Sequence, residues 1–173
     1  MYHIPIFNLS SFIPHLILII IIIYGLSTTE NQHDLSRQQK THHYLKLYVN
    51  WVITSAGFIY GTGHLFMPHK VANSIGWPSG NPFQTELAFS NLAFAIMALY
   101  ISNAGTGINN NIDTDINAYK TIVVGYLSFV GGCLLVHARE LYTHGNMNFN
   151  NLIGAPSFSI LNLIYGAYLL GNS

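Results

Sequence analysis

Five ionisable side chains of this sequence stand near the ends of long apolar segments, where they could carry out chemistry. They are His64, Glu86, His137, Glu140 and His144. A charged group placed at the centre of a membrane costs roughly 2.5–3.5 kcal/mol on insertion scales, so it needs a partner, a water-filled cavity or a function. Imidazole and carboxylate groups can share a metal ion or transfer a proton. We therefore take these five residues as candidate metal ligands or proton carriers, with no cofactor or reaction named by the sequence.

The spacing of the last three candidates places them on one face of a helix. Together with Cys133, the residues His137, Glu140 and His144 recur at i, i+4, i+7 and i+11. This spacing is similar to that of metal ligands, although no motif supplies the remaining ligands. The single cysteine excludes an internal disulfide and a paired-cysteine zinc site. A metal site and simple hydrogen bonding of the histidines between helices therefore both stay open.

Two other apolar segments carry the remaining candidates. Gly57 and Gly61 form a small-residue pattern that lets a second helix approach closely, and His64 lies on the same stripe. We therefore expect His64 to point toward protein rather than lipid. Glu86 shares a stripe with small and apolar residues of the next segment, and we expect this stripe to match the stripe of His64 in the bundle. Glu86 also stands in the first turns of its helix, where the helix dipole favours a carboxylate. It is equally consistent with a structural partner for a histidine and with a functional group.

Composition indicates a membrane protein. The chain has 173 residues, of which 50% are hydrophobic and only 7% charged, whereas a soluble domain has about 25% charged residues. The six basic and six acidic residues cancel, which leaves no basic surface for nucleic acid. No basic region precedes the first apolar run, so we expect a membrane span there rather than a signal peptide. The sequence predicts an all-α integral membrane bundle, one transmembrane domain over 1–173, with five helices at approximately 10–27, 45–67, 82–103, 118–142 and 151–170.

The threading of five spans brings the candidates to one depth. The C-terminal ends of the second and fourth spans and the N-terminal end of the third must lie at the same membrane face. This holds for either orientation of the chain. The distribution of Lys and Arg, four in the first and third loops against two in the others, favours an N-terminus outside the cell. Asn81, Pro82 and Gln84 have the order of a helix start with a capping box.

Several motifs resemble a family of small prokaryotic membrane proteins of unknown function. The resemblance runs from about Tyr48 to the C-terminus and is carried by Gly63-His-Leu-Phe-Met-Pro68, Ile75-Gly-Trp-Pro78 and Pro82-Phe-Gln84 with Glu86. It continues at His137 and Glu140, and near Phe149 this sequence departs from the usual pattern. The resemblance implies an all-helical membrane fold with a signature loop, and it implies no activity.

Two classes of function follow from these observations. The first is a non-catalytic accessory subunit of a larger membrane complex, because the chain is small and has small-residue stripes suited to helix packing. Its partners would be the lipid bilayer and other membrane subunits, in the cell membrane. The alternative is a membrane enzyme or a metal- or proton-binding protein that uses the His/Glu cluster at one membrane face. A transporter or channel is less favoured, because the polar residues gather at one face instead of crossing the bilayer.

Overall fold

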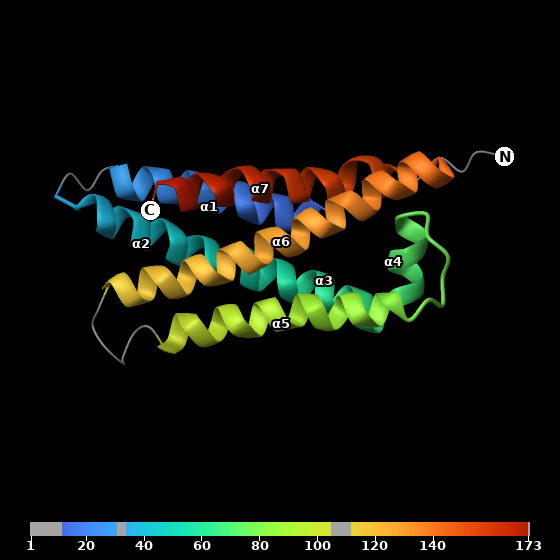
Figure 1. The fold of residues 1–173 in the computed structure, drawn as a ribbon, viewed down its shortest axis with the longest axis horizontal. Coiled ribbons are helices and arrows are strands. Elements are labelled where there is room, and N and C mark those ends of the chain that lie inside the picture. Colours follow the sequence, from blue (N-terminus) through green and yellow to red (C-terminus); the bar gives the residue numbers. More distant parts are fainter. Residues whose placement is uncertain (1–11, 31–33, 105–111, 173) are drawn as a thin grey trace.

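The chain folds into a bundle of helices, seen in a computed structural model that describes residues 12–30, 34–104 and 112–172 (Figure 1). No strand occurs in these ranges. The helices are α1 (Ile13–Glu30), α2 (Arg37–Leu47), α3 (Thr54–Phe66), α4 (Pro68–Ser74), α5 (Phe83–Ala104), α6 (Ile112–His144) and α7 (Ala155–Gly171). Two π-helical turns, η2 (Tyr48–Ile53) and η3 (Asn150–Gly154), join α2 to α3 and lead into α7. The all-helical fold class is confirmed.

Three helical segments are long and apolar enough to cross a membrane. They are Phe83–Asn103, Ile112–His144 and Asn150–Gly171, and Ile13–Thr28 is a shorter apolar helix. These three segments coincide with the predicted third, fourth and fifth spans. The predicted second span, 45–67, instead covers the end of α2, the π-helical turn η2 and α3. The predicted first span begins at residue 10, outside the described residues. A count of five spans therefore stays a prediction.

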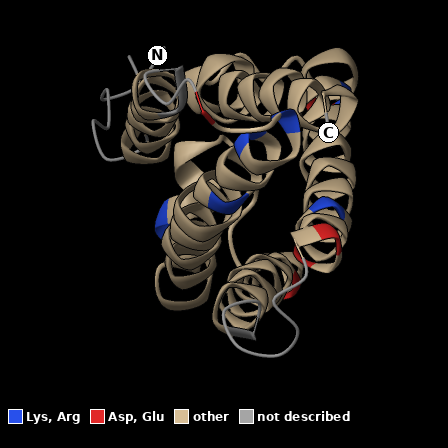
Figure 2. Ribbon diagram, turned by 90° about the vertical axis from the view of Figure 1, so that its left-hand side faces the viewer, with Lys and Arg blue, Asp and Glu red and all other residues tan. Residues whose placement is uncertain are grey.

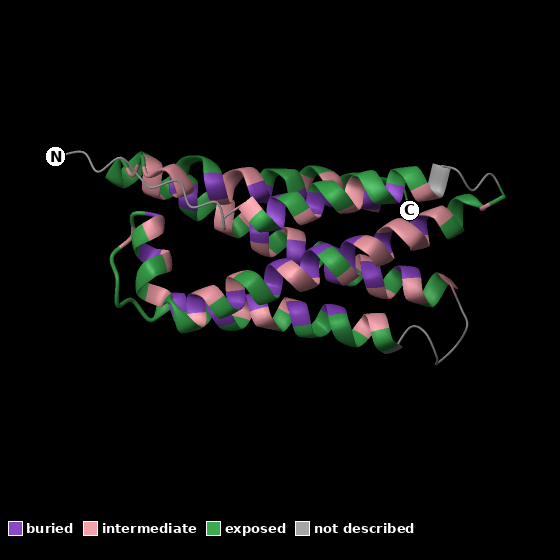
Figure 3. Cartoon of the chain, turned by 180° about the vertical axis from the view of Figure 1, so that it is seen from behind, coloured by how far each residue is buried: buried purple, intermediate pink, exposed green. Residues whose placement is uncertain are grey.

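The outward faces of the bundle are apolar, as expected for helices in lipid. Figure 3 shows the buried residues along the inward faces and the exposed residues along the outward faces. Among the exposed side chains are Leu135, at 72% exposure, and Ile164, at 64%. A view along the bundle shows how sparse the charged residues are on the described chain (Figure 2). Helices in contact with water would carry charged residues on their outward faces.

Close helix packing positions the site. The chief partner of α3 is α5, and that of α6 is α7. A Cβ atom added to Gly57 would lie 2.6 Å from the Asn91 carbonyl oxygen, and one added to Gly61 would lie 2.7 Å from the Leu92 side chain. The predicted close approach at these glycines is confirmed. In the core beside α7, the Tyr48 hydroxyl donates a 2.8 Å hydrogen bond to Asn162, which is fully buried.

Proline creates the short helix α4 at one end of the bundle. Pro68 has no N–H and cannot continue the hydrogen-bond ladder of α3, and Met67 before it leaves the helical conformation at φ −132° and ψ 43°. The chain then turns, and α4 stands across the end of the longer helices (Figure 1). It thereby faces the C-terminal half of α6 and the start of α7.

A histidine–aspartate pair lies at the opposite end, outside the predicted spans. His42 Nε2 on α2 is 3.6 Å from Asp115 Oδ2 on α6. Burial lowers the pKa of His42, the nearby His43 and Lys46 act in the same direction, and Asp115 opposes them. The His42 ring also packs against Tyr119, with the ring centroids 5.7 Å apart.

Candidate functional site

A cavity of about 660 Å³ lies among α3, α4, α5, α6 and the start of α7. Its walls are mostly apolar, with residues such as Val71, Phe129 and Phe158. The lining residues with polar or reactive side chains are Tyr60, Thr62, His64, Lys70, Ser74, Trp77, Asn91, Tyr126, Cys133, His137, Asn150 and Ser159. Ligand pockets in proteins typically enclose about 300–1,000 Å³, are lined by apolar and aromatic side chains, and have a few polar groups that fix orientation. This cavity has all three properties.

His64 enters the cavity from the last turn of α3. Its side chain is 8% exposed, and Nδ1 lies 2.6 Å from Oε1 of Gln84, which is 2% exposed. With the Gln84 amide in this orientation, its oxygen can only accept a hydrogen bond, so the proton of the neutral imidazole is assigned to Nδ1. Its Nε2 therefore has a free lone pair, and it makes no hydrogen bond to the described chain.

His137 enters the cavity from α6, and its Nδ1 also lies against a side-chain amide oxygen. Its Nδ1 is 2.8 Å from Asn151 Oδ1. The orientation of the Asn151 amide is fixed, because Nδ2 donates to the carbonyl oxygens of Asn146 at 3.0 Å and His137 at 3.4 Å. Nδ1 of His137 is therefore the donor, and its Nε2 is an acceptor without a partner in the described chain.

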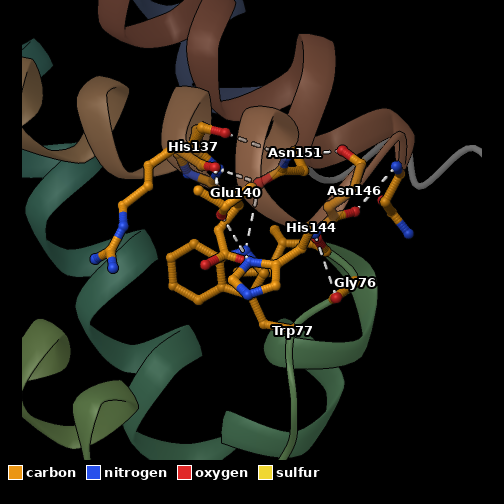
Figure 4. A network of polar contacts seen from close by, with 11 residues as sticks. Gly76, Trp77, His137, Glu140, His144, Asn146 and Asn151 are labelled. Atoms are coloured by element: carbon orange, nitrogen blue, oxygen red, sulfur yellow. Dashed lines mark hydrogen bonds and ion pairs between the residues drawn. The ribbon is translucent and has the colours of Figure 1, made fainter.

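The Ile75-Gly-Trp-Pro78 motif lies beside His137 and shares its hydrogen-bond partner Asn151 (Figure 4). The Trp77 indole donates to the same Asn151 oxygen at 3.3 Å, and its ring lies 5.4 Å from that of His137. Asn146 Nδ2 donates to the Ile75 carbonyl at 2.9 Å. Gly76 has φ +73°, and a Cβ there would lie 2.7 Å from Asn146 Oδ1, so only glycine fits this turn. Trp77 thus follows directly on this turn. It also lines the cavity.

The structure divides the five candidate residues. His64 and His137 line one cavity, and Cys133 joins them. Glu140 and His144 instead pair with each other, with 3.2 Å between Oε2 and Nδ1, and the His144 side chain is 65% exposed. Glu86 is exposed on α5. No three His, Cys, Asp or Glu residues of the described chain lie close enough to hold a metal ion.

The position of Glu86 follows from helix geometry. Gln84 faces His64, and two residues further on a helix has turned by about 200°, which carries Glu86 to the outside. The buried face of α5 is formed by Gln84, Ala88, Asn91, Ala95 and Ala98. The stripe of Glu86 expected to face the other helices was therefore wrong. The inward set has the same i, i+4, i+7 spacing and consists of small or amide side chains, which was the signal available in the sequence.

The cavity also contains hydroxyl groups that the sequence gave no reason to select. The hydroxyls of Tyr60, Tyr126 and Ser159 make no hydrogen bond within the described chain. Buried polar groups almost always have a hydrogen-bond partner. Water or a bound molecule in the cavity can supply such a partner to these hydroxyls.

Comparison with known proteins assigns the chain to a family whose function is unknown. A family model matches residues 10–173. The chain belongs to DUF6790, a family of unknown function. The match begins well before Tyr48, so the DUF6790 sequence pattern includes α1 and α2 as well as the motifs around the cavity. No curated protein and no solved structure is significantly similar to this DUF6790 chain.

Proposed function

We propose that this DUF6790 chain is a protein of the cell membrane that binds a small, uncharged and largely apolar molecule in the cavity between α3 and α7. The observation that carries the proposal is a cavity of about 660 Å³ with mostly apolar walls. A few polar atoms in these walls, such as Nε2 of His64 and of His137, have no hydrogen-bond partner in the described chain. A bound molecule would cover the apolar walls and satisfy these polar atoms together.

The charge of the lining supports an uncharged ligand. The described lining residues include no carboxylate, and the only permanently charged one, Lys70, is exposed on α4. Transfer of an ion into an apolar site is costly unless an opposite charge is present. A cation would meet no carboxylate among the described lining residues, and an anion would meet only the solvent-exposed Lys70, so a neutral molecule fits this lining best.

The rim of the cavity supports uptake from lipid. Ile13, Ile59 and Met67 line the cavity and are also exposed apolar residues, at 47%, 36% and 49% exposure. A molecule dissolved in the hydrocarbon would meet apolar side chains at these three positions. This is the path expected for a ligand with low solubility in water.

This proposal develops the second function expected from the sequence. It keeps His64 and His137 in the binding site and places Glu86, Glu140 and His144 outside it. The role of an accessory subunit stays a prediction, and native mass analysis after mild extraction tests it. A monodisperse monomer without partners would contradict that role.

Fluorescence tests the binding proposal, because the chain has two tryptophans and only one lines the cavity. The Trp51→Phe variant leaves Trp77 as the reporter. We expect ω-bromoundecane, whose bromine quenches indole on contact, to quench Trp77 along a saturating curve. The Trp77→Phe variant is the control, since Trp51 is 59% exposed on the outer surface and reports ligand in the surrounding detergent or lipid. Identical, non-saturating quenching in both variants would contradict the proposal.

A further inference from the structure

We infer that the ligand of this cavity carries a hydroxyl group, which donates a hydrogen bond to a histidine Nε2 and accepts one from a neighbouring hydroxyl of the protein. The inference rests on the proposed function and adds the chemical class of the ligand. It follows from the hydrogen-bond capacity of the polar atoms left free in the cavity.

The two histidines offer lone pairs, not protons. Each Nδ1 donates to a side-chain amide oxygen, that of Gln84 at 2.6 Å for His64 and that of Asn151 at 2.8 Å for His137. A neutral imidazole has one N–H, so each Nε2 can only accept. A ligand that satisfies them must be a hydrogen-bond donor.

The protein hydroxyls complete the complementarity. Tyr60, Tyr126 and Ser159 have hydroxyls without partners in the described chain, and each can rotate to donate to an oxygen of the ligand. A hydroxyl group has one proton to donate and two lone pairs to accept with. It therefore matches an imidazole Nε2 and a tyrosine or serine hydroxyl at the same time.

Other common polar groups fit less well. An ether or a carbonyl can only accept, so it would leave the Nε2 lone pairs without a partner in an apolar site, which costs free energy. An aliphatic amine donates but is protonated near neutral pH, and the described lining offers no carboxylate to balance its charge. These differences give the inference a direct chemical test.

The test compares two ligands on one protein. In the Trp51→Phe background, ω-bromoundecanol and its methyl ether are titrated while Trp77 fluorescence is recorded. We expect the alcohol to bind about tenfold more tightly, the effect of one hydrogen bond that the ether cannot make. Equal affinities would overturn the inference and leave the proposed function standing. Absence of saturation with both ligands would overturn the proposed function and, with it, the inference.

Variants assign the preference to residues. In the same background, His64→Phe and His137→Phe should each reduce the ratio of the two affinities, and the double variant should abolish it. Retained binding of the methyl ether shows that these variants are folded. His69→Phe is the matched control, because His69 is exposed on α4 and does not line the cavity. A tenfold preference that persists in the double variant would overturn the assignment to the histidines.

Discussion

Asn151 organises the polar side of the cavity, and its replacement by leucine is the sharpest test of the network. The residue is 1% exposed. Its oxygen accepts from His137 at 2.8 Å and from Trp77 at 3.3 Å, and its nitrogen donates to two carbonyl oxygens. Leucine has a similar size and can make none of these bonds. The substitution therefore removes hydrogen bonds with little change in volume.

The magnitude follows from the donors left behind. A buried donor without an acceptor costs about 1–3 kcal/mol, and Asn151→Leu leaves the N–H groups of His137 and Trp77 in that state. The longer bond to the half-buried Trp77 belongs at the lower end of this range. We expect a total loss of about 2–4 kcal/mol, which for a chain of this size lowers the midpoint of thermal unfolding by about 5–15 °C.

The assay is thermal unfolding of the purified protein in detergent, followed by circular dichroism. Asn172→Leu is the matched control, because Asn172 is exposed and its side chain bonds only the Tyr168 carbonyl at the end of α7. We expect the control to shift the midpoint by a few degrees at most. If both variants unfold at the same temperature, Asn151 does not hold the network together and the assigned tautomer of His137 loses its support.

Three further predictions concern packing and pH. Gly57→Ala should lower the free energy of unfolding by about 1–3 kcal/mol, because the added Cβ would lie 2.6 Å from a backbone oxygen. Gly63→Ala is the control in the same thermal assay and should be tolerated, because its Cβ would lie 3.8 Å from the nearest neighbour. Asn162→Leu should cost about 1–3 kcal/mol by leaving the buried Tyr48 hydroxyl without an acceptor, and an unchanged midpoint would contradict this. Because burial lowers the pKa of His42 from about 6.5, the native state binds fewer protons than the unfolded state, so stability present at neutral pH falls as the pH drops below this value. His42→Gln should flatten that pH profile, and an equally steep profile would show that other groups cause it.

The sequence was sufficient to predict the three long apolar helices and the end of the bundle at which His64 and His137 lie. Long apolar blocks predicted the segments around α5, α6 and α7, and the glycine pattern at Gly57 predicted a close helix contact. Chain threading placed His64 and His137 near one end, and both line the same cavity. These predictions succeed because they depend only on helix length and connectivity.

The face that each helix turns inward was harder to predict. On α5 the stripe through Glu86 was chosen because a carboxylate in a membrane suggests a function, yet Gln84 is the residue that faces His64. Glu86 stands close to the helix start and can remain exposed, so it carries no penalty that would require an inward position. Charge alone was therefore a weaker guide than the row of small residues ending at Ala98.

The partners of the histidines depend on contacts distant in the sequence. Asn151 reaches His137 across the connection between α6 and α7, and Trp77 reaches the same amide from the segment after α4. Only the turn at Gly76 and the position of α4 bring these groups together. No local pattern identifies such a junction, which is why Asn151 was missed.

Photolabelling tests the occupied cavity most directly. An undecanol with a diazirine on its chain is activated with the protein in membranes, and the labelled residues are mapped by mass spectrometry. We predict labels on Tyr60, Cys133 and Ser159, and we predict that excess unlabelled undecanol removes them. Labels confined to outward residues such as Leu135 and Ile164, unchanged by the competitor, would contradict binding in this cavity.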